Sequence, residues 1–223
     1  NPGCGYHLCA PFTMEQTRPT ERFTGLSDLY AKARPSYPPA IIRWCLDLLP
    51  TPPKLIVDVG CGTGISTRAF AETGHATIGI EPNSEMRAAA IALGGASYME
   101  GTSTSTGLPD SSADLIVAAQ AFHWFDIPET LREFARIGTG RAMCAAFWNI
   151  REMEGAFMTG YEDLLRRHST EYEVNDRALR TLAHLRSAVG AQGREHIVHH
   201  TIRMDNSRLR TLALSSSYVK HGV

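Results

Sequence analysis

The sequence predicts a doubly wound α/β fold, in which a mostly parallel sheet carries helices on both faces. Short apolar segments rich in β-branched residues alternate with segments of helical periodicity five times between residues 54 and 148. Continuous apolar runs of this kind are typical of strands that are buried on both faces, as in parallel sheets. Right-handed crossovers place the connecting helices on both faces of such a sheet, so the alternation predicts the doubly wound arrangement.

The expected elements have recognisable beginnings and ends. Pro38 stands where a helix can begin without losing backbone donors, and Pro50 ends that helix. Gly74 is placed to cap the end of the second helix, and Asn83 or Ser84 to cap the start of the third. The expected helices cover residues 39–49, 65–73, 84–93, 127–138, 153–167 and 177–189, with a further one over 207–219. The expected strands cover residues 54–59, 76–80, 97–100, 114–119 and 141–148, with a β-like stretch at 196–204.

The composition argues against several functional classes. The 223 residues include 22 Lys plus Arg and 23 Asp plus Glu, which gives a formal net charge of -1. This balance, with no local block of basic residues, argues against a general nucleic-acid binder. No apolar run approaches the roughly 18 residues of a membrane span, and no signal segment opens the chain. We therefore expect a cytoplasmic protein with no nucleic-acid or membrane partner.

The cysteines and histidines do not suggest a metal centre. The five cysteines include no CxxC pair, which argues against a disulfide framework and against a zinc ribbon. Cys4, His7 and Cys9 could be read as metal ligands, but three ligands within six residues rarely enclose a metal. His199 and His200 would alternate faces on a strand, so they could not bind one metal together. We expect no metal.

The most informative segment is Asp58-Val59-Gly60-Cys61-Gly62-Thr63-Gly64, which lies between a buried strand and a helix. Glycines at such a turn adopt positive φ angles and let a ligand lie against bare backbone. The plain alternative is a tight strand-to-helix connection that merely happens to be rich in glycine. A dinucleotide fingerprint has its third glycine where this chain has Ile65. Asp58 also suits a ligand with an ammonium group better than one with a pyrophosphate, so the segment favours S-adenosylmethionine over NAD.

This segment resembles motif I of the class I S-adenosylmethionine-dependent methyltransferases, which implies a Rossmann-like fold. Residues 119–126, Ala-Gln-Ala-Phe-His-Trp-Phe-Asp, are similar to the stretch after the fourth strand in the type 11 branch. That branch includes trans-aconitate methyltransferase-like and ubiquinone or menaquinone methyltransferase-like proteins. Residues 30–38 are similar to its N-terminal lid, and residues 101–109 resemble its adenine loop. The resemblance extends over most of the native chain.

The resemblance implies a set of cofactor-binding residues. Glu81 stands where the family uses a carboxylate to accept both ribose hydroxyls. The adenine loop has Ser103 and Thr104 where relatives commonly carry an acidic residue, so backbone carbonyls or a hydroxyl would recognise adenine. Tyr30 and Arg34 are expected to close over the cofactor, although a solvated lid charge is the alternative for Arg34. The full expected set is Tyr30, Arg34, Asp58, Gly60, Cys61, Gly62, Gly64, Glu81, Pro82, Ser103, Thr104 and Gln120.

His123 is the candidate catalytic residue, because it follows the fourth strand at the edge where open α/β sheets bind ligands. It could serve as a general base, or its ring could pack on the cofactor or cap a turn. Trp124 and Phe125 are read as core or adenine-packing aromatics, with substrate stacking as the alternative. Cys61 is read as a small apolar filler, since no basic partner accompanies it in the sequence.

These observations lead to one expected organisation and activity. Residues 1–13 resemble a vector-derived leader, 14–50 are expected to form a lid and helix, and 51–150 a cofactor-binding core. Residues 151–223 are expected to form C-terminal helices and a strand, truncated so that the last strand of the sheet is missing. The expected activity is S-adenosylmethionine-dependent methyl transfer to a small-molecule acceptor, by a monomer or homodimer. The alternatives are an NAD(P)-dependent oxidoreductase and a non-catalytic S-adenosylmethionine-binding module.

Overall fold

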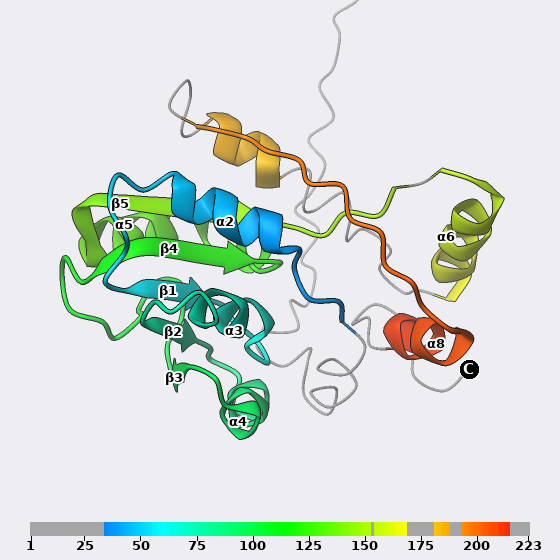
Figure 1. Cartoon of the computed structure of the whole chain (residues 1–223), viewed down its shortest axis with the longest axis horizontal. Helices are drawn as coiled ribbons and strands as arrows, with labels where there is room; N and C mark the ends of the chain where they lie inside the picture. Colours follow the sequence, from blue (N-terminus) through cyan, green and yellow to red (C-terminus); the bar gives the residue numbers. More distant parts are fainter. Residues whose placement is uncertain (1–33, 153, 169–180, 188–192, 215–223) are drawn as a thin grey trace, which may run out of the picture.

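The computed structural model describes residues 34–152, 154–168, 181–187 and 193–214, and it contains a five-stranded sheet with helices packed beside it (Figure 1). The strands follow the order β3-β2-β1-β4-β5, and every neighbouring pair is parallel. Their bounds are β1 Ile56–Val59, β2 Thr77–Ile80, β3 Ser97–Met99, β4 Ala113–Ala119 and β5 Gly138–Phe147. The chain changes direction across the sheet between β1 and β4, the point at which open α/β sheets bind ligands. The predicted doubly wound fold is confirmed.

The helices begin and end close to the predicted residues. Asn83 caps α4 by accepting a hydrogen bond from the Met86 N–H at 3.0 Å, and Asp126 caps α5 by accepting one from the Glu129 N–H at 3.1 Å. These caps satisfy backbone donors that have no partner within the first turn of a helix. The helices are α2 Pro39–Asp47, α3 Ile65–Ala71, α4 Ser84–Leu93, the 3-10 turn η2 Phe122–Trp124, α5 Ile127–Ile137, α6 Ala156–His168 and α8 Asn206–Leu214.

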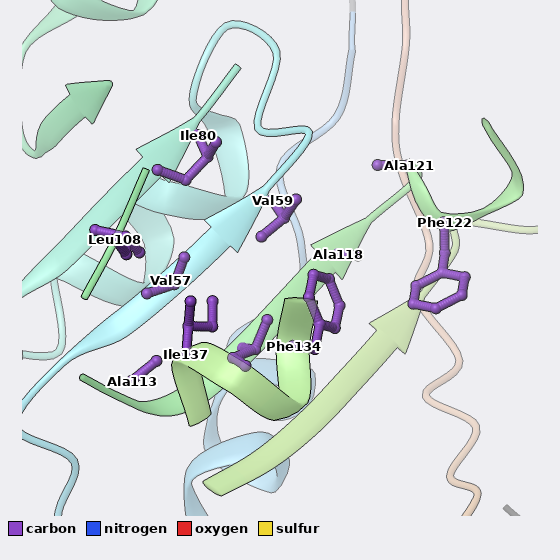
Figure 2. Close-up of a cluster of buried hydrophobic side chains, with 11 residues drawn as sticks. Val57, Val59, Ile80, Leu108, Ala113, Ala118, Ala121, Phe122, Phe134 and Ile137 are labelled. Atoms are coloured by element: carbon purple, nitrogen blue, oxygen red, sulfur yellow. The ribbon is translucent and has the colours of Figure 1, made fainter. Parts of the chain in front are cut away.

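Side chains of alternate residues in the central strands point to opposite faces of the sheet and belong to two hydrophobic cores, one on each face. On one face, Val57 and Ala118 belong to the cluster that contains Phe134 and Ile137 of α5, as Figure 2 shows. On the other face, a second cluster contains side chains of β1, β4, α2 and α3: Ile56, Leu115, Val117, Ile42, Cys45 and Phe70. Because both faces of β1 and β4 are buried, the carboxyl ends of these strands are held rigidly at one edge of the sheet.

The strand β5 begins at Gly138, three residues earlier than predicted, so α5 leads into it without a loop. A Cβ added to Gly138 would lie 2.9 Å from the Phe134 carbonyl oxygen and 3.0 Å from the Ala142 Cβ. A glycine is therefore required at this close passage from helix to strand. The register of β5 against β4 shifts between Ala113 and Leu115, which accommodates the early start.

The C-terminal region differs from the prediction at one point. Residues 196–204 were expected to be β-like, but the described segment 193–205 forms no strand, so this expectation is wrong. A strand requires hydrogen bonds to a neighbouring strand, and this segment pairs with none of the five. Instead the His196 ring stacks on Trp44 of α2, with ring centroids 5.3 Å apart.

Several other predictions fall partly or wholly on residues outside the described ranges. The 1–13 leader, the possible ligands Cys4, His7 and Cys9, and lid residues 14–33 all lie outside them. Of the helix expected at 177–189, residues 181–187 are described and helical. Within the described residues, no helix has the length and apolar character needed to cross a membrane, and no cluster of three potential metal ligands occurs.

Candidate functional site

The glycine loop connects the end of β1 to the start of α3, and its backbone explains its glycines. Gly60, Gly62 and Gly64 have φ angles of 71°, 56° and 78°, which L-residues with side chains rarely adopt. The Gly60 and Cys61 N–H groups both donate to the Ile80 carbonyl, at 2.8 and 3.2 Å. The loop is therefore tied to the end of β2, the next strand in the sheet.

The three glycines meet different surroundings. A Cβ on Gly60 would lie 2.7 Å from the Ala121 Cβ, and one on Gly64 would collide with the Tyr98 ring. A Cβ on Gly62 would meet no atom within 4 Å. Gly60 and Gly64 are thus required for packing inside the protein. Gly62 faces open space, as expected where a ligand lies against bare backbone.

Asp58 lies at the end of β1 and is fully buried. Its Oδ2 accepts hydrogen bonds from the Ser66 and Thr67 hydroxyls, at 2.6 and 2.7 Å. Its Oδ1 is buried and has no hydrogen-bond partner. Burial raises the pKa of Asp58 to about 6, although the two hydroxyls act in the opposite direction. A buried acceptor without a donor is costly, so this oxygen fits a ligand that brings a donor.

Glu81 follows β2 and contacts the glycine loop directly. Its Oε2 accepts a hydrogen bond from the Gly62 N–H at 2.8 Å, and its Oε1 accepts one from the Asn83 N–H at 2.9 Å. Its burial raises its pKa, against the effect of these two N–H groups. Arg87 donates to the Glu81 carbonyl at 2.7 Å and forms an ion pair with Glu100 at 2.9 Å, so α4 helps to hold this turn.

The predicted adenine loop is anchored by α5. Thr106 is fully buried, and both its N–H and its hydroxyl donate to Glu133, at 2.8 and 2.6 Å. Hydrogen bonds from Arg136 and Thr106 lower the pKa of Glu133 to about 2. At the tip of the loop, the Ser103 hydroxyl accepts a hydrogen bond from Thr130 at 2.9 Å, while Thr104 is exposed.

The stretch after β4 packs against the glycine loop. Gln120 has a φ of 57°, which is unusual for a residue with a side chain, and its side-chain amide donates to the Asn149 carbonyl at 3.3 Å. His123 lies in η2 and is half-buried. Its Nδ1 is 3.1 Å from the Nε1 of Trp148, which follows β5. This arrangement joins the ends of β4 and β5 beside Gly60.

The structure brings together some of the predicted site residues but not all of them. Asp58, the three glycines of the loop and Glu81 come together at the ends of β1 and β2. Cys61 is buried, and burial raises its pKa well above its ordinary range, which suits an unreactive apolar side chain. Arg34 is half-buried at the start of the described chain, and Tyr30 lies outside it.

Comparison with known proteins places these features in a family. Residues 57–144 match the family model described as a methyltransferase domain. An uncharacterized methyltransferase of Mycobacterium tuberculosis is 35% identical over 124 residues, covering 55% of this chain and 50% of the relative. Another from Schizosaccharomyces pombe is 31% identical over 132 residues, covering 58% and 52%. These similarities identify residues 57–144 as a methyltransferase domain.

One solved structure agrees with this methyltransferase assignment. A candidate type II methyltransferase from Anaeromyxobacter dehalogenans superposes with a TM-score of 0.55 and is 28% identical, covering 63% of this chain and 62% of that one. The chain spans about half the length of the curated methyltransferases that it matches.

Four residues that shape this candidate site were not identified from the sequence. A Cβ on Gly79 of β2 would lie 2.7 Å from the Cys61 Sγ and from the Tyr98 ring, so β2 needs a glycine behind the loop. Tyr98 itself fills the space beside Gly64, and the Arg68 side chain donates to its hydroxyl at 3.3 Å. Glu133 and Trp148 act through partners 27 and 25 residues away in the chain. No local signal marks such pairings, because they exist only after the strands have assembled.

Proposed function

We propose that this chain binds S-adenosylmethionine at the ends of β1 and β2 and transfers its methyl group to a small-molecule acceptor. The observation that carries the proposal is the contact between Glu81 and the Gly62 N–H at 2.8 Å. It brings a buried carboxylate to the edge of a bare glycine loop. That pairing matches a ligand with both a sugar and an amino-acid end.

The residues fit this cofactor in three respects. Each carboxylate oxygen of Glu81 has a second lone pair beyond the backbone N–H that it already accepts, so two ribose hydroxyls can donate to it. The Oδ1 of Asp58, buried without a partner, suits the ammonium group of the methionine end, directly or through a water. The open space beside Gly62 is the place where bare backbone can meet the ligand.

The adenine end is expected at the turn that contains Ser103 and Thr104. Neither side chain is acidic, so recognition of the adenine amino group would rest on a hydroxyl or on backbone carbonyls. The hydrogen bonds between Thr106 and Glu133 hold this loop in place from beneath. Pro82 and Gln120 border the same edge of the sheet and complete the proposed binding residues, with Arg34 and Tyr30 contributed by the lid.

The cofactor supplies a methyl group that its sulfonium has already activated. The task left to the protein is to hold the acceptor in line and to exclude water. Positioning of this kind contributes roughly 7–11 kcal/mol to lowering a barrier. A base is needed only where the acceptor atom still carries a proton. The small-molecule nature of the acceptor and the state of the protein as monomer or homodimer are parts of the proposal.

Equilibrium dialysis with radiolabelled S-adenosylmethionine tests the proposal. Wild-type protein is expected to bind, and Glu81→Ala should bind more weakly by about 1.5–3 kcal/mol, the range for losing hydrogen bonds to a charged group. Glu72→Ala serves as the matched control, since this exposed glutamate ends α3 and lies outside the site. Equal affinity of Glu81→Ala and wild type would mean that the ribose lies elsewhere.

Two further measurements separate the competing functions. A thermal shift with NAD or NADP, but none with S-adenosylhomocysteine, would replace the proposal with an oxidoreductase. Methyl transfer from the labelled cofactor is then measured with a panel of small carboxylates, phenols and amines. Tight binding of the cofactor with no transfer to any member would favour a non-catalytic binding module.

A further inference from the structure

His123 and Trp148 come from different elements and meet at the edge of the sheet beside the glycine loop. His123 belongs to the η2 turn after β4, and Trp148 directly follows the last residue of β5. The indole Nε1 lies 3.1 Å from the imidazole Nδ1. An indole nitrogen can only donate a hydrogen bond, so the Nδ1 of His123 must be the acceptor.

This hydrogen bond determines where the proton of the neutral imidazole ring lies. A neutral ring carries one N–H and one lone pair, and here the lone pair is at Nδ1, directed at Trp148. The N–H is therefore at Nε2. In this tautomer the only N–H of the ring is at Nε2, while Nδ1, the atom that could take up a proton, already accepts the hydrogen bond from the indole.

The turn that carries His123 is held rigidly against the cofactor loop. Ala121 lies so close to Gly60 that an added Cβ would approach its Cβ to 2.7 Å, and it would approach the Phe125 ring to 3.1 Å. The Trp124 N–H donates to the Ala121 carbonyl at 2.9 Å, which closes the turn. Phe122, 1% exposed, anchors the turn in the core against Phe134, with ring centroids 6.2 Å apart.

We propose that Trp148 is a positioning residue that holds His123 as an Nε2–H donor, so that His123 assists the reaction as a hydrogen-bond donor and not as a general base. The role of His123 in the reaction rests on the proposed methyl transfer. The tautomer that it assigns does not depend on that function. Two readouts therefore test it, one with the protein alone and one with the reaction.

The first readout is the long-range proton–nitrogen NMR spectrum of the histidine rings at pH 7.5, with His123 assigned by comparison with His123→Gln. Wild-type His123 is expected to show a protonated Nε2 and an unprotonated Nδ1. Trp148→Phe keeps the bulk but removes the donor, so a mixture of both tautomers is expected there. Trp44→Phe is the matched control, because Trp44 stacks on His196 and packs with the other core. A protonated Nδ1 in wild type, or an unchanged pattern in Trp148→Phe, would overturn the proposal.

The second readout is methyl transfer to any acceptor that the panel identifies. His123→Gln places an amide N–H near the position of Nε2 but cannot act as a base, whereas His123→Phe can do neither. We expect His123→Gln to lose less than about tenfold in rate, with a larger loss for His123→Phe. General-base catalysis contributes about 10²–10⁴-fold, so an equal loss of that size in both variants would overturn the donor role. Failure of the cofactor to bind would refute the methyltransferase proposal, while the NMR result would still decide the tautomer.

Discussion

Replacing Gly62 with alanine separates the role of this residue in binding from its role in folding. Gly62 and Gly74 both have left-handed backbones, with φ angles of 56° and 86°, and an added Cβ would meet no atom within 4 Å at either position. Each alanine substitution should therefore cost about 1–2 kcal/mol in the free energy of unfolding, from backbone strain alone. Only Gly62 lies in the loop proposed to hold the cofactor, so only Gly62→Ala places a methyl group in the ligand's volume.

Urea unfolding and dialysis with S-adenosylhomocysteine together provide the assay. The two variants should lose similar stability, but Gly62→Ala should bind the ligand at least about tenfold more weakly, or about 1.4 kcal/mol. Gly74→Ala should bind as tightly as wild type. Wild-type affinity in Gly62→Ala, or an equal loss of affinity in Gly74→Ala, would refute the assignment of the loop. Gly62→Val, with its larger β-branched side chain, should bind more weakly than Gly62→Ala.

Three further predictions concern stability. Glu133→Gln should lower the free energy of unfolding by about 1.5–3 kcal/mol at pH 7, measured in urea. Because the pKa of Glu133 lies below its ordinary value, its contribution should be present above pH 4.5 and lost as the pH falls toward 2, an acid limb that the variant should lack. Asp58 behaves oppositely: its pKa is raised to about 6, so wild-type stability should fall by roughly 3 kcal/mol as the pH rises from about 4 to 6, and Asp58→Asn should remove this slope. Gly79→Ala should lower thermal stability through overpacking of about 1–3 kcal/mol, and unchanged melting would contradict the contacts with Cys61 and Tyr98.

The sequence was most informative where a local pattern and its chemistry coincide. The strand–loop–helix unit around Gly60 and Gly62 was predictable because buried strands are apolar and left-handed turns require glycine. The resemblance to the methyltransferases placed Glu81 beside this loop, and the parallel pairing of β1 and β2 explains the contact, since the carboxyl ends of neighbouring strands share one edge. Residues 196–204 illustrate the limit of such reasoning. Their local preference resembles that of a strand, but a strand also needs a neighbour, and none of the five accepts this segment.

Side-chain pairings between distant segments could not be predicted in this way. The hydrogen bond from Trp148 to His123 depends on the adjacency of β4 and β5, and on the turn that brings His123 back toward the sheet. The sequence identified His123 as a candidate base from its position alone. Its proton-accepting nitrogen could be assigned only when the indole donor was seen beside it. The hydrogen bonds from Thr106 to Glu133 likewise require α5 to pack against the loop of residues 101–109.

A crystal structure of the protein with S-adenosylhomocysteine would show whether the cofactor binds at the ends of β1 and β2. We expect both ribose hydroxyls within hydrogen-bond distance of the Glu81 carboxylate, and the amino-acid end against the backbone at Gly62 with its ammonium near Asp58. A ligand that leaves Glu81 bonded only to backbone N–H groups, or that lies away from the end of β1, would contradict this expectation.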